Sequence, residues 1–270
     1  MNWWMQLDKK RGSRPRCVSM MAGSPDEVAA RLTRLVDRSD VAVSSNDKWM
    51  PREKPVMKTD GTWDTTPADE MILGKPTNLL SQVEQSQLTT WWLEHDAPGR
   101  PNFDIASTCT VNGQKGLLLI EAKAHDVELR DEEKGKELKP EASERSFANH
   151  LHIGRAVADA AGAFQRFTRL RWAISRDQRY QMSNRFSSAC KLTEMGYAVV
   201  LVYLGFLNAN EMADQGEPFK MPDQWDSLVK THSTPLFSDE VWNNKWNIHG
   251  RTFVPLIRSV EWEFEEKVQS

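Results

Sequence analysis

Three charged residues, Asp104, Glu121 and Lys123, are of the types that bind metal ions and phosphate groups. An acid, any residue and then a lysine is a pattern that occurs five times, beginning at Asp8, Glu121, Glu132, Glu137 and Glu265. Only Glu121-Ala122-Lys123 ends an apolar run, Gly116-Leu-Leu-Leu-Ile120. Charged side chains on such a strand lose part of their hydration, which is costly unless a metal, an opposite charge or a substrate compensates. This instance is therefore the candidate site.

The spacing of these residues places the two acids together. Residues 102–111 and 116–124 favour β-strands, and Asn112-Gly113 between them is a strong signal for a two-residue hairpin turn. In that register Asp104 lies directly opposite Glu121. A four-residue loop would instead place Asp104 opposite Lys123, on the same face.

Two facing carboxylates require a cation between them, because like charges on adjacent strands are destabilising. Mg²⁺, or Mn²⁺ in its place, is the natural candidate, since Mg²⁺ is held by one or two carboxylates with water and phosphate. The alternative is a salt bridge across the strands between Asp104 and Lys123, with Glu121 facing solvent.

The segment Pro101-Asn102-Phe103-Asp104 followed by Glu121-Ala122-Lys123 resembles the bipartite signature of the PD-(D/E)XK nucleases. The resemblance covers about residues 78–207 and implies an α/β restriction-endonuclease-like core, with a mixed central β-sheet flanked by helices. It also implies a magnesium-dependent phosphodiesterase. Asp104, Glu121 and the carbonyl of Ala122 would bind the metal, and Lys123 would orient or deprotonate the attacking water. Glu84, on a preceding helix, matches the position of an additional metal ligand.

A second group of residues is a candidate nucleic-acid surface. Gln181, Asn184 and Arg185 share one face of a predicted helix, and His125 follows the site lysine closely. Some PD-(D/E)XK nucleases carry tyrosine four residues after the glutamine, whereas this chain has Arg185, which could hold a phosphate. The alternative is a solvated helix face. The sequence also departs from the family in the two residues between Pro101 and Asp104, and in the short space for a first strand before Asn102.

The elements that must position these residues are predicted from periodicity and end signals. Ser24 caps one helix and Asn78 a second that runs to about His95, with further helices over 147–167 and 177–195. Residues 198–207 read as a strand covered on both faces, and 125–146 as a solvated connection without core residues. The predicted organisation is an N-terminal extension (1–70), a nuclease-like core (71–210) and a tryptophan-rich C-terminal extension (211–270).

Composition bounds the remaining possibilities. There are 35 Lys and Arg against 38 Asp and Glu, a net charge of −3, yet Lys9–Arg16 and Arg166–Arg185 are locally basic. Such runs either contact phosphate or pair with the acidic segment 126–144. Three cysteines without a C-x-x-C spacing, no signal peptide and no apolar run near 20 residues predict a soluble cytoplasmic protein without a membrane partner.

Rival chemistries have less support. His150 and His152 are two apart in a predicted helix and cannot share a zinc ion there, and neither a glycine-rich phosphate loop nor a G-x-S-x-G elbow occurs. The sequence thus favours a metal-dependent nuclease acting on DNA. A nucleic-acid- or protein-binding module that retains the fold without turnover is the alternative, and a homodimer is compatible with either.

Overall fold

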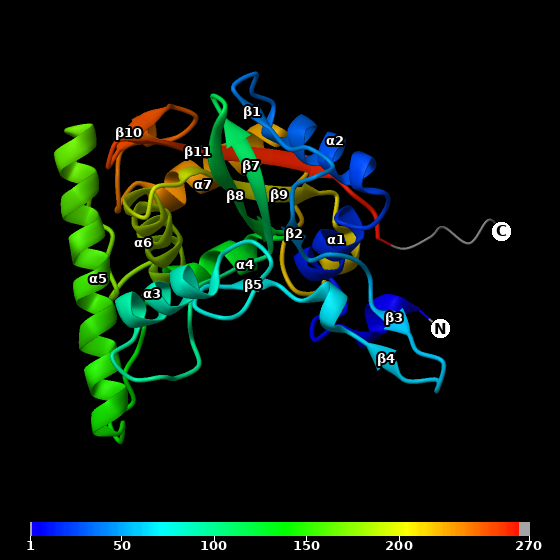
Figure 1. Ribbon diagram of the computed structural model, residues 1–270, viewed down its shortest axis with the longest axis horizontal. Coiled ribbons are helices and arrows are strands. Elements are labelled where there is room, and N and C mark those ends of the chain that lie inside the picture. The colour runs from blue at the N-terminus through cyan, green and yellow to red at the C-terminus, as the bar shows by residue number, and fades with distance from the viewer. Residues whose placement is uncertain (1, 265–270) are drawn as a thin grey trace.

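The predicted hairpin forms, and it forms in the expected register. In the computed structural model, which describes residues 2–264, β7 (Ile105–Val111) and β8 (Gln114–Lys123) are antiparallel, with Val111 opposite Gln114 and Ile105 opposite Ile120 (Figure 1). Asn112 and Gly113 both have positive φ, 51° and 73°, as a type I′ turn requires. The turn therefore fixes which residues of the two strands face one another.

The hairpin belongs to a mixed seven-stranded sheet with the order β1-β7-β8-β9-β11-β10, in which β2 also pairs with β7. β9 (Ala198–Leu207) is the predicted buried strand, and it runs parallel to both β8 and β11 (Arg251–Glu261). All ten residues of β9 are buried, as its unbroken apolar sequence predicts.

The other strands of the described chain are short. They are β1 (Val41–Ala42), β2 (Trp49–Met50), β3 (Val56–Met57), β4 (Trp63–Asp64), β5 (Met71–Ile72), β6 (Asn102–Phe103) and β10 (Trp246–Ile248). The α-helices are α1 (Ser13–Met20), α2 (Pro25–Val36), α3 (Gln82–Trp92), α4 (Asp126–Arg130), α5 (Glu144–Thr168), α6 (Tyr180–Glu194) and α7 (Pro222–Ser233). Single 3₁₀ turns are η1 (Trp3–Gln6), η2 (Thr66–Ala68), η3 (Asp131–Glu133), η4 (Asn210–Met212) and η5 (Asp239–Val241).

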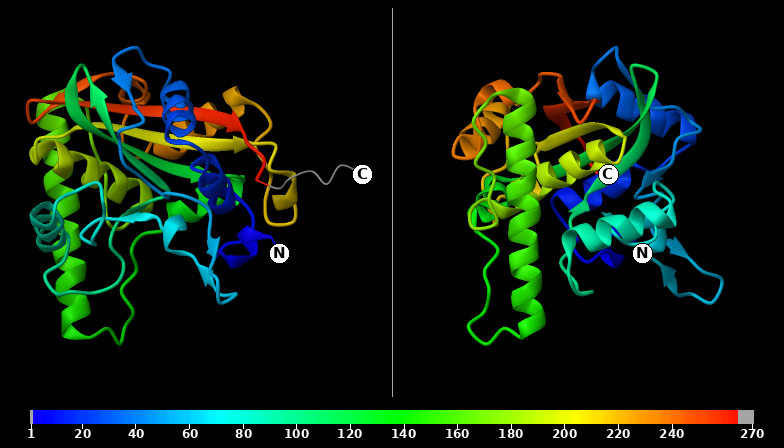
Figure 2. Two further views of the ribbon diagram at one scale, coloured as in Figure 1. Left: turned by 45° about the vertical axis from the view of Figure 1, so that its right-hand side comes forward. Right: turned by 60° about the vertical axis from the view of Figure 1, so that its left-hand side comes forward.

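Helices cover both faces of the sheet, so the protein is mixed α/β (Figures 1 and 2). Successive residues of β8 point to opposite faces. Leu117 and Leu119 join the core beneath α3, α5, α6 and α7, and Leu118 and Ile120 join the core beneath α1 and α2. By this alternation Glu121 and Lys123 face the side that α6 covers.

Several helix predictions are confirmed, with shifted ends. Ser24 caps α2 through a reciprocal capping box with Glu27. The helix predicted from Asn78 begins three residues later than expected, because Ser81 forms a capping box with Glu84. The helices predicted over 147–167 and 177–195 correspond to α5 and α6, and Gly196, with φ of 99°, follows the end of α6.

The prediction that residues 125–146 contribute nothing to the interior is wrong. This segment forms α4 and η3, in which Leu129 and Glu132 are buried. The segments expected as extensions also enter the main sheet: 1–70 supplies β1 and β2, and 211–270 supplies β10 and β11. One sheet therefore combines strands from all three parts of the predicted organisation.

The three cysteines, Cys17, Cys109 and Cys190, are free and buried. Their burial agrees with the absence of a disulfide framework in the sequence. Within residues 2–264 no helix has both the length and the apolar character needed to cross a bilayer.

Candidate functional site

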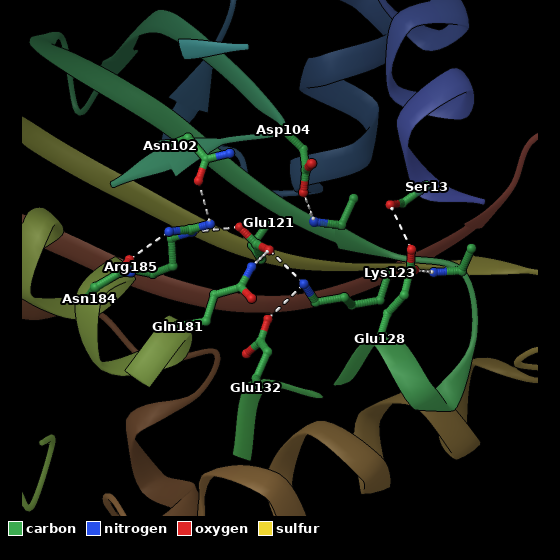
Figure 3. A network of polar contacts seen from close by, with 12 residues as sticks. Ser13, Asn102, Asp104, Glu121, Lys123, Glu128, Glu132, Gln181, Asn184 and Arg185 are labelled. Carbon is green, nitrogen blue, oxygen red and sulfur yellow. Dashed lines mark hydrogen bonds and ion pairs between the residues drawn. The ribbon is translucent and has the colours of Figure 1, made fainter. Parts of the chain in front are cut away.

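The acid and the lysine at the end of β8 are buried and in contact. Glu121 is 2% exposed and Lys123 is 5% exposed, and the Lys123 Nζ lies 2.6 Å from the Glu121 Oε1. Asp104 lies one step beyond the last paired residues of the hairpin, and its Oδ2 accepts a hydrogen bond of 2.7 Å from the backbone N–H of Ala122 (Figure 3). The two-residue turn thus brings all three predicted residues to one end of the hairpin.

Side chains from α6 complete the surroundings of Glu121. Arg185 Nε donates to the Glu121 Oε2 at 2.6 Å, and Gln181 Nε2 donates to the Glu121 Oε1 (Figure 3). The alternative arrangement, in which Asp104 pairs with Lys123 and Glu121 faces solvent, is wrong, because Lys123 forms ion pairs with Glu121 and Glu132.

The charges of the two acids are compensated to different degrees. Burial acts to raise the pKa of Glu121, but the positive charges of Arg185 and Lys123 outweigh it and the pKa is lowered. Burial raises the pKa of Asp104 well above its usual value, and the charges of Glu121 and Glu70 raise it further. Asp104 is therefore the carboxylate whose ionised form lacks a neighbouring cation strong enough to stabilise it.

Lys123 is held in its charged form. Burial acts to lower its pKa, but the surrounding carboxylates, Glu121 and Glu132 first among them, raise the pKa above the usual lysine value. At neutral pH this amine is an ammonium ion that donates hydrogen bonds and offsets negative charge. It is poorly suited to accept a proton.

A cavity of about 290 Å³ opens onto these groups. Its lining combines the hairpin end with the N-terminal segment, the α4–η3 region and α6. The lining residues are Asp8, Lys9, Ser13, Glu70, Asn102, Asp104, Glu121, Ala122, Lys123, Glu128, Asp131, Gln181 and Arg185. Six of these carry carboxylates and three carry basic groups, so the cavity has an excess of negative charge that favours cations.

Other predicted residues lie elsewhere or act differently. Glu84 is not among the residues that line the cavity; its carboxylate caps α3 and accepts a hydrogen bond from the Tyr197 hydroxyl. Asn184 is buried, and its Oδ1 accepts a hydrogen bond from Arg185 Nη1. His125 is 5% exposed and is also not part of the lining. Of the predicted nucleic-acid-binding residues, only Gln181 and Arg185 line the cavity.

Two acids near the site were not predicted from the sequence. Glu70 lines the cavity, accepts a hydrogen bond from Asn102 and contacts Arg14. Glu132 has a side chain with no exposed surface, and its Oε1 lies 2.7 Å from the Lys123 Nζ. Leu129, three residues before Glu132, was the available signal, since an apolar residue at that spacing indicates a shared buried face.

The basic runs are only partly buried, and their exposed members are Lys9, Lys10, Arg11, Arg166, Arg169 and Arg171. Arg14 and Arg16 are buried and form ion pairs with Glu70 and Glu211, while Lys9 lines the cavity. In the second run, Arg179 pairs with Glu133 of the acidic segment, as the alternative interpretation expected.

The acids at the cavity supply carboxylate oxygens, the donor type that hard divalent cations prefer. No group of three or more His, Cys, Asp or Glu side chains within residues 2–264 is arranged to hold a metal ion. In many proteins, however, Mg²⁺ is bound by only one or two carboxylates, and water and phosphate complete its coordination shell. Asp104, Glu121 and Ala122 line the cavity, and the two acids carry carboxylate oxygens of that kind.

Comparison with known proteins gives no relatives: no protein-family model, no curated protein and no solved structure matches the chain.

Proposed function

We propose that this protein is a metal-dependent nuclease with a restriction-endonuclease-like core, which hydrolyses phosphodiester bonds of DNA. The observation that carries the proposal is the meeting of Asp104, Glu121 and Lys123 at one cavity, at the end of an antiparallel hairpin. Two acids and a charged amine can promote hydrolysis of a phosphodiester, because the reaction depends on positioning and on stabilising negative charge.

Under this proposal Asp104, Glu121 and the Ala122 carbonyl hold Mg²⁺ or Mn²⁺. The bound ion would lower the pKa of a water molecule and stabilise charge on the phosphoryl oxygens. The uncompensated charge of Asp104 supports this role, since a cation would favour its ionised form.

Lys123 orients the attacking water and offsets charge on the phosphoryl group. Its raised pKa supports an electrostatic role over that of a general base, the other role implied by the family resemblance. Arg185 and Gln181 line the same cavity from α6, and under the proposal phosphate oxygens would share their donors with Glu121. The DNA is thereby contacted from both the sheet and the helix layer.

One observation favours the alternative of a binding module without turnover. Both oxygens of Glu121 already accept hydrogen bonds from Lys123, Gln181 or Arg185, so the carboxylate is satisfied by the protein itself. A protein that had lost catalysis could keep such a network to stabilise its core. In that case the cavity would bind nucleic acid and leave it intact.

Cleavage assays with two variants test the proposal. Purified protein with Mg²⁺ or Mn²⁺ is incubated with supercoiled and linear DNA. We expect cleavage by the wild type, and a rate lower by on the order of 10²–10³-fold in Lys123→Met and in Asp104→Asn. Asp104→Asn keeps a hydrogen-bond acceptor for the Ala122 N–H, so its fold is expected to persist.

Lys134→Met is the matched control, because Lys134 also follows an acid by two residues but its side chain is 73% exposed. Its activity should equal that of the wild type. DNA binding without cleavage by the wild type would support the alternative, and unchanged cleavage in Asp104→Asn or a folded Lys123→Met would contradict the proposal.

A further inference from the structure

Glu132 is a buried carboxylate that the site described so far does not use. It lies in η3, and no part of its side chain is exposed. Removing an ionised carboxylate from water costs several kcal/mol unless an opposite charge compensates. The segment around Glu132 is otherwise rich in exposed charged residues. Packing of that segment alone therefore does not account for the burial of this acid. Its contacts should therefore reveal its role.

The strong contact of Glu132 is with the site lysine. The Glu132 Oε1 lies 2.7 Å from the Lys123 Nζ, and the Oε2 lies 3.7 Å from His232 Nε2 on α7. Within the described residues neither carboxylate oxygen accepts a hydrogen bond of regular geometry. The attraction is mainly ionic, and Lys123 supplies the nearest charge.

Lys123 is thus held from two sides. Glu121 on its own strand contacts the ammonium at 2.6 Å, and Glu132 contacts it from η3 (Figure 3). Under the proposed function Glu121 is also a metal ligand, and its charge is shared with the metal and Arg185. If Glu121 were the only partner of Lys123, metal binding to Glu121 would weaken the ion pair that fixes the ammonium.

We propose that Glu132 is a positioning residue, which fixes the Lys123 ammonium in the cavity independently of Glu121. This inference rests on the proposed nuclease function, because it assigns Lys123 a task that needs a fixed position. Glu132 does not line the cavity and acts through Lys123. His232, Tyr203 and Arg185 also lie close enough to interact with its charge.

The kinetic test is a double-mutant cycle of Glu132→Gln and Lys123→Met. Glutamine keeps the shape of Glu132 and removes its charge. We expect Glu132→Gln to lower kcat about 10- to 100-fold with KM little changed, which is the usual effect of losing an outer partner. In the Lys123→Met background the same change should lower kcat no further, because Glu132 acts only through the amine. Glu132→Asp, which retains the charge, should recover part of the rate.

Glu133→Gln is the matched control, since Glu133 is the next residue of η3 and its side chain is 53% exposed. Its kcat should equal that of the wild type. A kcat unaffected by Glu132→Gln, or lowered equally in the presence and absence of Lys123, would overturn the inference.

A second measurement needs no activity and no metal. In NMR spectra of the metal-free protein a fixed, buried ammonium gives a slowly exchanging N–H signal, whereas an exposed one does not. We expect such a signal for Lys123 in the wild type and in Glu133→Gln, and its loss, or hydrogen exchange at least about tenfold faster, in folded Glu132→Gln. Should Glu132→Gln not fold, Glu132→Asp is measured, and faster exchange of the same signal is expected.

The two measurements separate the two proposals. A wild type without nuclease activity would contradict the proposed function, while the Lys123 signal would still report on Glu132. An unchanged signal in the Glu132 variant would overturn the positioning role even in an active nuclease.

Discussion

At the residue scale the two acids of the site have unequal electrostatic partners. Glu121 accepts charged hydrogen bonds from Lys123 and Arg185, whereas Asp104 accepts one from a backbone N–H and faces the negative charges of Glu121 and Glu70. The ionised form of Asp104 therefore lowers the stability of the metal-free protein. Under the proposed function this cost is expected, because active sites commonly carry charges arranged for the bound state.

Replacing Asp104 should accordingly stabilise the metal-free protein. The folded state raises the pKa of Asp104, so ionisation is penalised by folding once the pH exceeds the ordinary value of 3.8. At pH 7 Asp104→Asn should increase the free energy of unfolding by about 1–2 kcal/mol and the Tm by about 3–6 °C. The gain should disappear below about pH 4, where the wild-type carboxyl is protonated in both states. Thermal unfolding in a chelator at both pH values checks this, and a Tm at pH 7 equal to or below that of the wild type would contradict it.

The site residues that could be predicted are those whose positions follow from local sequence rules. A two-residue turn sets the strand register, and helical spacing sets the shared face of Gln181 and Arg185. Glu70 could not be found in this way, because it lies in a connecting segment without an apolar period. The only local signal for Glu132 was the single apolar residue Leu129, three positions earlier.

At the element scale α1 is held by a partner distant in sequence. The Arg16 side chain is 4% exposed and forms an ion pair with Glu211 of η4, in which Arg16 Nη2 donates to the Glu211 Oε2 at 2.8 Å. Gly12 and Trp262 also accept hydrogen bonds from the guanidinium through their carbonyls. These contacts explain how a segment that the sequence suggested as a basic surface patch can form a buried helix.

Loss of this pair should destabilise the protein in a pH-dependent manner. Burial acts to raise the pKa of Glu211, but the hydrogen bonds and charge of Arg16 lower it below 4.5. Its stabilisation is thus present above about pH 4.5 and is lost as the pH falls through the lowered pKa. Glu211→Gln should cost about 2–3 kcal/mol at pH 7, somewhat less than a fully buried pair because the Glu211 side chain retains 28% exposure.

Urea unfolding at pH 7 and at pH 3.5 measures this effect, and the difference between variant and wild type should shrink at the lower pH. Asp214→Asn is the control, because the Arg11–Asp214 pair is about half exposed on both sides and should contribute under about 1 kcal/mol. Equal losses in the two variants would contradict the role given to Arg16.

The start of a helix could be predicted where the sequence offered only one capping residue. At α3 two polar residues competed, and the reciprocal Ser81–Glu84 capping box decides the start against Asn78. That box also gives Glu84 a structural task in place of the predicted metal contact. Strands of two residues, such as β1 and β2, are too short to show any alternation and were not predicted.

At the scale of the whole molecule the sheet depends on the C-terminal part of the chain. β11 pairs with β9 over nine residues, from Phe253 opposite Val199 to Glu261 opposite Leu207. The sequence did not predict this strand because it contains Pro255, and proline normally indicates an edge strand. Here β11 lies between β9 and β10, and the Pro255 carbonyl accepts a hydrogen bond from Asn243 outside the strand pairs.

A fragment limited to residues 71–210 should therefore not fold, although the family resemblance falls entirely within it. It would expose one edge of β9 and the apolar face that α1 and α2 cover, although β9 is fully buried in the whole chain. Expression of this fragment and of the whole chain, compared by solubility and by far-ultraviolet circular dichroism, checks the prediction. A soluble fragment that unfolds cooperatively would show instead that 71–210 is an independent domain.

The burial of all three cysteines makes the protein convenient for spectroscopy. Cys17, Cys109 and Cys190 are 0, 2 and 4% exposed, and burial raises the pKa of each thiol, to about 12 for Cys109 and Cys190. Thiolates are the reactive form, so the native thiols should be almost inert to maleimides near neutral pH. A cysteine introduced at one surface position can then carry a fluorophore or spin label without any removal of the native ones.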